Sequence, residues 1–182
     1  MSEPIRQEPA LMMHASLEAL PPLDLPKGMQ LRSFQEDDDE AWSHIISVSF
    51  KRPYDFNEHM KKDSAYQAER VLFVLVDGVF AATAAAWQVE KTPADTGYLH
   101  MVGALPEYKG RKLGYFISLA AMHKLRQEGF SRVSLNTDDF RLPAIKTYLS
   151  LGFVPDLLMH LSMPERWEKI YTLLNNKEKG TQ

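Results

Sequence analysis

The sequence contains no cysteine, and this absence removes several kinds of chemistry at once. A chain of 182 residues without a thiol has no disulfide, no thiolate zinc site and no cysteine nucleophile. Long apolar runs are also missing, since the longest candidates are strand-sized, at residues 71–76 and 79–87. A helix that crosses a bilayer needs about 20 apolar residues in a row, so we expect no membrane span.

A large excess of charge of either sign is absent as well. The formal net charge is −3, which gives no general reason to expect a nucleic-acid partner. The N-terminal region carries Glu3, Glu8 and Glu18 among scattered prolines, and it lacks the apolar segment of a secretory signal. The histidines show no metal-ligand spacing. We therefore expect a cytoplasmic protein with no metal, no membrane partner and no nucleic-acid partner.

What is present is the pattern of one α/β domain. Strands are predicted at residues 29–34, 71–76, 79–89, 97–105, 131–137, 153–154 and 157–162, and helices at residues 37–50, 53–70, 111–128, 141–151 and 164–175. Asp77-Gly78, between two β-rich runs, predicts a two-residue hairpin turn. Strand 97–105, helix 111–128 and strand 131–137 form a crossover unit, so these two strands are expected to be parallel.

The ends of the chain differ in composition from the middle. Residues 1–28 are rich in proline and are predicted to be an arm, flexible in part, in which residues 11–20 pack on the body. Residues 29–162 are expected to form the main domain. Residues 163–182 are predicted to be a C-terminal helix and a frayed tail.

The most informative run is Pro-Glu-Tyr-Lys-Gly-Arg-Lys-Leu-Gly at residues 106–114, between a predicted strand and a predicted helix. A basic, glycine-bearing turn at a helix start presents free backbone N–H groups at the positive end of the helix dipole, which suits a phosphate group. The two glycines have an alternative explanation, the close packing of one helix on another. Neither G-x-x-x-x-G-K-[ST] nor G-x-G-x-x-G occurs, which argues against an NTPase and against a Rossmann dinucleotide site.

The stretch at residues 102–114 resembles the acyl-CoA-binding motif of the GNAT superfamily of N-acetyltransferases. The motif ends in [Q/R]-x-x-G-x-[G/A], which falls on Lys109, Lys112 and Gly114. Lysine therefore stands at Lys109 where the family has glutamine or arginine, and at Lys112 where it has glycine. Both positions are expected to contribute backbone N–H groups, so these side chains need not abolish binding.

A second stretch, Ala-Ile-Lys-Thr-Tyr-Leu-Ser-Leu-Gly-Phe at residues 144–153, is similar to the A-I-x-x-Y-x-x-x-G-F segment of the same family. The two stretches occur in the family's order and at about its spacing, and the resemblance covers residues 29–162. It implies a mixed α/β (α+β) fold, in which a mostly antiparallel central sheet contains a parallel, splayed strand pair and has helices on both faces.

The resemblance also implies a function. The expected activity is transfer of an acetyl group from acetyl-CoA, as cosubstrate, to a primary amine by direct attack in a ternary complex. A non-enzymatic acyl-CoA-binding or regulatory module on the same fold is the alternative, and a partner-binding domain without CoA is a weaker one. The acceptor amine is not specified by the sequence, and the protein is expected to be a monomer or a homodimer.

For CoA, the resemblance points to backbone contacts. Residues 102–104 are expected to pair with the pantetheine amides as an added strand would, and the amides of residues 109–114 to hold the pyrophosphate. The expected cofactor-binding residues are Val102, Gly103, Ala104, Lys109, Gly110, Arg111, Lys112, Leu113, Gly114 and Asn136.

Tyr148 is the expected general acid, because the family often gives a tyrosine at this place the task of protonating the leaving thiolate. A phenol with a pKa near 10 is protonated at neutral pH and can donate a proton. The alternative is that Tyr148 simply packs on an apolar helix face with Ile145 and Leu149.

The expected base is His100. Strict alternation along its strand places His100 on one face with Tyr98, Val102 and Ala104. Histidine ordinarily has a pKa suited to accepting a proton near neutrality. The alternatives are a structural histidine, Glu90 as the base, or no protein base at all.

Overall fold

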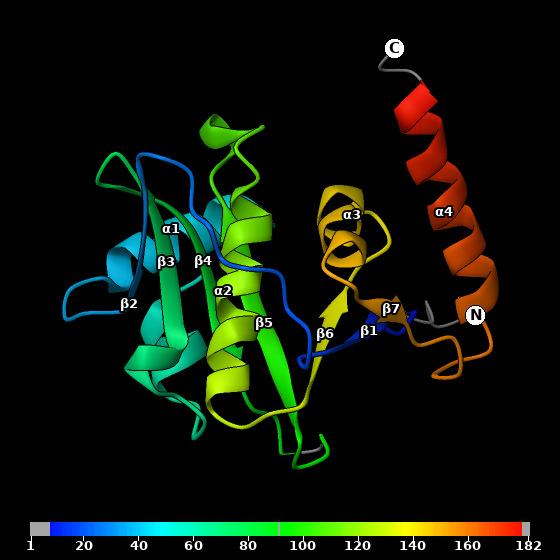
Figure 1. The fold of residues 1–182 in the computed structure, drawn as a ribbon, viewed down its shortest axis with the longest axis horizontal. Coiled ribbons are helices and arrows are strands. Elements are labelled where there is room, and N and C mark those ends of the chain that lie inside the picture. The colour runs from blue at the N-terminus through cyan, green and yellow to red at the C-terminus, as the bar shows by residue number, and fades with distance from the viewer. Residues whose placement is uncertain (1–7, 91, 180–182) are drawn as a thin grey trace, which may run out of the picture. The chain divides into compact units, whose positions relative to one another are not determined.

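The computed structural model describes residues 8–90 and 92–179. It has a mixed α/β fold with a seven-stranded sheet in the order β2-β3-β4-β5-β6-β1-β7 (Figure 1). The strands are β1 (Leu11–Ser16), β2 (Met29–Ser33), β3 (Val71–Val76), β4 (Val79–Trp87), β5 (Thr96–Ala104), β6 (Arg132–Thr137) and β7 (Val154–Pro155). The helices are α1 (Asp39–Phe50), α2 (Leu113–Gln127), α3 (Leu142–Ser150) and α4 (Met163–Lys179).

The chain divides into two compact units. The larger unit is Ala15–Ser134, and the smaller unit combines the described residues up to His14 with those from Leu135 onward. In the larger unit β2, β3, β4 and β5 form antiparallel pairs, and β5 pairs in parallel with the start of β6. In the smaller unit β1 and β7 are antiparallel. The predicted mixed, mostly antiparallel sheet with one crossover pair is confirmed.

The predicted hairpin is also confirmed. Asp77 has φ 50° and Gly78 has φ 84°, and Val76 pairs with Val79 across the turn. Two consecutive left-handed residues match the right-handed twist of the flanking strands, which is why Asp-Gly is favoured here.

Helices α1 and α2 cover opposite faces of the sheet in the larger unit (Figure 1). Helix α1 packs on β4 and β5, and its first turn carries Asp39 and Glu40, which complement the helix dipole. Helix α2 packs on β3, β4 and β5, and Gly129, two residues after its last residue, has φ 94°. Glycine adopts this left-handed conformation without the steric cost that a side chain brings.

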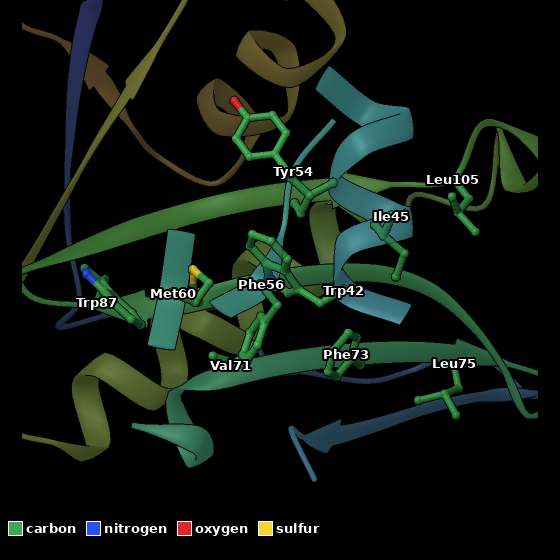
Figure 2. Close-up of a cluster of buried hydrophobic side chains, with 12 residues drawn as sticks. Trp42, Ile45, Tyr54, Phe56, Met60, Val71, Phe73, Leu75, Trp87 and Leu105 are labelled. Atoms are coloured by element: carbon green, nitrogen blue, oxygen red, sulfur yellow. The ribbon is translucent and has the colours of Figure 1, made fainter. Parts of the chain in front are cut away.

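An aromatic cluster fills the space between α1 and the sheet (Figure 2). Phe56 lies at its centre, with its ring stacked on Phe34 at a centroid distance of 4.5 Å and in edge contact with Trp42 at 5.2 Å. Phe56 and Trp42 are fully buried. The cluster therefore holds α1, and the loop that follows it, against one face of the sheet.

The helix predicted at residues 53–70 is wrong. The structure has only a π-helical turn at Asn57–Lys61 and a 3-10 turn at Ala68–Arg70. Side chains of α1 hold the loop instead, because Ser47 Oγ accepts the N–H of Tyr54 at 2.9 Å and Ser43 Oγ accepts the N–H of Phe56 at 3.0 Å. The apolar spacing in this segment serves to bury separate anchors in the aromatic cluster, so tertiary packing overrides the helical pattern.

Two further expectations need correction. The strand predicted at residues 157–162 is absent, because Asp156 Oδ1 accepts the N–H groups of Leu158 and Met159 and closes a local turn. Residues 11–16, expected to belong to a packing arm, form strand β1 with alternating burial. The sequence predicts that about the first ten residues are loose, and residues 1–7 of these lie outside the described part of the chain.

Among the described helices, none combines the length and apolarity that a bilayer crossing requires.

Phe56→Ala is expected to lower the free energy of unfolding by about 3–5 kcal/mol, because it empties the centre of the aromatic cluster. Phe140→Ala is the matched control, since Phe140 is 78% exposed and should change stability by no more than about 0.5 kcal/mol. Urea denaturation measures both, and similar losses in the two variants would contradict the role given to the cluster.

Candidate functional site

The site begins where β5 turns into α2. A 3-10 turn at Pro106–Tyr108 follows β5, and α2 begins at Leu113. Between them the backbone is left-handed twice, at Gly110 with φ 89° and at Lys112 with φ 55°. This geometry reverses the chain and aims the first N–H groups of α2 outward from the end of the helix.

The hydrogen bonds of the turn leave several N–H groups without a partner. The N–H of Lys109 bonds to the Pro106 carbonyl at 3.1 Å, and that of Arg111 to the Tyr108 carbonyl at 3.2 Å. In the described part of the chain no acceptor binds the N–H groups of Gly110, Lys112, Leu113 and Gly114. These four groups, which we call the N–H cradle, lie at the positive end of the α2 dipole, and this arrangement fits a phosphate or diphosphate.

The glycines of the turn do not serve close packing. A Cβ atom added to Gly110 or Gly114 would meet no atom of the described chain within 4 Å. The space beside these two glycines is therefore not filled by packing within the described chain.

Lys112 occupies the position where the related motif has glycine, and its φ of 55° gives the physical reason for that glycine. A side chain in the left-handed region costs about 1 kcal/mol or more. The side chains of Lys109, Arg111 and Lys112 are exposed around the cradle. They add positive charge where a diphosphate would lie.

Strand β5 carries a bulge just before Gly103, a position whose glycine is also consistent with a bulge. Met101 has φ 48°, and the pairing with β4 shifts between Ala85–His100 and Thr83–Gly103. Between these two pairs the chain advances by three residues on β5 and by two on β4. Strand β5 therefore contains one extra residue, which is a β-bulge. Strict alternation fails at this point.

The bulge changes which residues share a face. A Cβ on Gly97 would meet Leu125 of α2, whereas a Cβ on Gly103, six positions later, would meet Ile46 of α1. Without an extra residue both glycines would face the same helix. His100 therefore shares its face with Tyr98 and Gly103, and the expectation that Val102 and Ala104 lie on that face is wrong.

His100 lies in an aromatic environment on β5. Its ring centroid is 5.4 Å from that of Trp87 and 5.8 Å from that of Tyr98. Burial among these groups lowers the pKa of His100 to about 4, and the negative charge of Asp63 opposes the shift only in part. The imidazole is consequently neutral at physiological pH. The rival base, Glu90, follows β4 and is exposed.

Gly103 permits a close approach of α1 to β5. The position of its missing Cβ lies 2.9 Å from Ile46 Cδ1 and 2.9 Å from Ser49 Oγ. Ser49 Oγ in turn accepts the N–H of Ala104 at 3.0 Å and donates to its carbonyl at 3.3 Å. Nothing in the sequence identified Ser49, because this contact joins residues 55 positions apart.

Tyr148 and Asn136 belong to the smaller unit. Tyr148 lies on α3, which begins with Pro143 in its first turn and is followed by Gly152 with φ 86°. The Tyr148 side chain is 6% exposed, and its ring centroid is 5.8 Å from that of Phe153. Asn136 is exposed on β6.

The structure thus brings together one group of the expected site residues, from His100 through Gly114, on a single strand, turn and helix start of the larger unit. Within residues 8–90 and 92–179, no three histidine or carboxylate side chains gather as a metal site would require.

Comparison with known proteins gives a consistent picture. The model of the acetyltransferase (GNAT) family matches residues 31–153. A mycothiol acetyltransferase of Kytococcus sedentarius is 30% identical over 144 residues, which cover 74% of this chain and 48% of that protein. The chain spans about half the length of the curated relatives that it matches.

Solved structures share the fold. A GCN5-related N-acetyltransferase from Sphaerobacter thermophilus superposes with a TM-score of 0.63 at 20% identity, over 82% of this chain and 50% of that one. An aminoglycoside N-acetyltransferase in complex with CoA superposes with a TM-score of 0.59 at 18% identity, over 75% of this chain and 97% of that one.

Lys112→Gly is expected to leave the free energy of unfolding unchanged or to raise it by up to about 1 kcal/mol, because glycine relieves the left-handed backbone. Arg126→Gly, at an exposed position inside α2, is the control and should lose about 1 kcal/mol. Equal losses in denaturant titrations of the two variants would contradict the strain assigned to Lys112.

The lowered pKa of His100 predicts a pH dependence of stability. The unfolded chain protonates this histidine below about pH 6.5, whereas the folded protein does so only near pH 4. The contribution of His100 is therefore complete above pH 6.5 and is lost as the pH falls towards 4. His100→Gln should flatten the fall in unfolding free energy across this window, and His44→Gln, at an exposed position, should not. Superimposable curves for wild type and His100→Gln would rule out the shift.

Proposed function

The chain belongs to the GNAT family of acetyltransferases, and from this premise we propose that it transfers an acetyl group from acetyl-CoA to a primary amine by direct attack in a ternary complex. The observation that carries the proposal is the N–H cradle, whose donors have no partner among the described residues and whose glycines leave open space. The CoA named in a matched structure supports the choice of donor.

In this proposal the backbone binds acetyl-CoA, the acetyl donor. The N–H groups of Gly110 and of residues 112–114 hold the diphosphate, and the charges of Lys109 and Arg111 reinforce them. The strand segment at residues 102–104 pairs with the pantetheine arm. Bound there, acetyl-CoA supplies an acyl group activated as a thioester.

Proton movement falls to side chains. The imidazole of His100 is neutral but is a weaker base than an ordinary histidine, because burial lowers its pKa to about 4. In this proposal it accepts a proton from the attacking amine, and the Tyr148 hydroxyl donates one to the leaving sulfur. N–H groups of β5 beside the bulge at Met101 polarise the carbonyl oxygen. The balance is one C–N bond formed, one C–S bond broken and one proton carried from nitrogen to sulfur. Asn136 is proposed as a further contact of the donor.

The proposal is tested with purified protein, acetyl-CoA and a panel of amines that includes an aminoglycoside, an amino acid, a peptide N-terminus and a small alkyl amine. Release of free CoA thiol with a matching acetylated amine supports it. Tight CoA binding without acetylation of any amine favours a non-enzymatic acyl-CoA-binding module. If the protein does not bind CoA at about 1 mM, the weak end of ordinary affinities, both the acetyltransferase and the acyl-CoA-binding module are ruled out.

Tyr148→Phe isolates the proposed acid. The variant keeps the buried ring and its packing near Phe153 but removes the hydroxyl. We expect kcat to fall by about 100-fold or more, with little change in the Kd of CoA, because loss of general acid catalysis acts on the chemical step. A kcat equal to that of the wild type would assign Tyr148 to packing alone.

Gly114→Ala and Gly114→Val test the cradle as a graded pair. A Cβ here meets no described atom within 4 Å, so alanine should keep or slightly raise the melting temperature. Any ligand in that space loses room as the side chain grows. The Kd of CoA should therefore rise in the order glycine, alanine, valine, reaching about tenfold or more for valine, and calorimetry measures it. Unchanged affinity in both variants would place CoA elsewhere.

A further inference from the structure

Helix α1 carries three serines, and all three bond to backbone outside the helix. Ser43 and Ser47 hold the loop after α1, as described above. Ser49 instead reaches β5, at the segment proposed to pair with the pantetheine arm. Two of these serines therefore hold the loop, and the third bonds to the proposed ligand strand.

The polar groups of Ala104 point away from β4. The N–H of Leu105 bonds to the Ala81 carbonyl at 2.8 Å, and Ala82 lies opposite Ala104. In an antiparallel ladder the bonded pairs alternate with unbonded ones, so the N–H and C=O of Ala104 face the other edge of β5. The parallel pairing with β6 ends at Tyr98 and Ser134 and does not reach Ala104.

Ser49 supplies the hydrogen-bond partners that a neighbouring strand would otherwise provide at Ala104. One hydroxyl accepts the N–H of Ala104 and donates to its C=O, so it satisfies both groups that an added strand would use. Gly103 makes this possible, because a Cβ there would lie 2.9 Å from Ser49 Oγ and would push α1 away.

We infer that Ser49 is a placeholder, whose hydroxyl occupies the hydrogen-bonding groups of Ala104 until the amide-bearing pantetheine arm of CoA displaces it. This rests on the proposed function. The hydroxyl competes with the arm for the same donor and acceptor, so it weakens binding of the arm while keeping the strand edge satisfied in the free protein. Ser49 is in this sense a positioning residue that sets donor affinity.

Ser49→Ala is the direct test, with two ligands measured by calorimetry on the full chain. CoA carries the pantetheine arm, and 3′-phospho-ADP carries the same diphosphate without it. The variant should bind CoA about three- to tenfold more tightly than wild type, a change equivalent to one net hydrogen bond. Its affinity for 3′-phospho-ADP should not change, since the N–H cradle does not involve Ser49.

Ser47→Ala is the matched control, because it removes a hydroxyl of the same helix that bonds, among the described residues, to Tyr54 and not to β5. It should change neither affinity. Ser49→Cys provides a second variant of similar size, whose thiol hydrogen-bonds weakly, and should show the same selective tightening.

The possible results separate the ideas. Tighter CoA binding with unchanged 3′-phospho-ADP binding supports the placeholder. Unchanged or weaker CoA binding in both Ser49 variants, or equal changes for the two ligands, overturns it while the proposed function stands. Failure of wild type and variants alike to bind CoA overturns both the placeholder and the proposed function.

Discussion

One extra residue in β5 decides how the site is built. The left-handed backbone of Met101 shifts the phase of the strand, so that Gly103 turns toward α1 and Val102 does not. Only with glycine at that contact does α1 come close enough for Ser49 to reach Ala104. The same shift fixes where β5 ends relative to α1. Bulges of this kind redirect side chains beside active sites, and here the redirected element is the strand that leads into the N–H cradle.

The cradle and the strand edge treat unsatisfied backbone groups in different ways. At Ala104 a side chain supplies partners, which removes a desolvation penalty of about 1–3 kcal/mol. At Gly110 and residues 112–114 no described group accepts the backbone N–H. The groups of Ala104 are thus satisfied within the protein, whereas the four N–H donors of the cradle remain available to a strongly anionic ligand.

The sequence predicted the parts of this protein that depend on local signals. Asp77-Gly78 specified the hairpin and Gly129 the end of α2, because each needs a left-handed residue that few side chains tolerate. The glycine at Gly103 is consistent with a bulge in this segment, but the left-handed residue at Met101 escaped prediction, since methionine carries no preference for that conformation. The contact of Ser49 escaped too, because it depends on packing between segments far apart in sequence. The false helix at residues 53–70 has the same origin: its apolar spacing reflects separate anchors in a core that only the tertiary fold defines.

Two residues near the proposed site, Met101 before the proposed ligand strand and Lys112 at the start of α2, have a left-handed backbone although neither is glycine. Their surroundings differ. Met101 is packed against the aromatic cluster, so burial offsets its strain, which costs about 1 kcal/mol or more. Lys112 is exposed and gains no such packing. Its positive charge also lies at the N-terminus of α2, where the dipole disfavours a cation. In the proposed function, an anion on the cradle offsets the unfavourable charge at Lys112, because it attracts the ammonium group and neutralises the helix end. The proposed diphosphate would therefore make a lysine at this position more favourable than it is in the free protein.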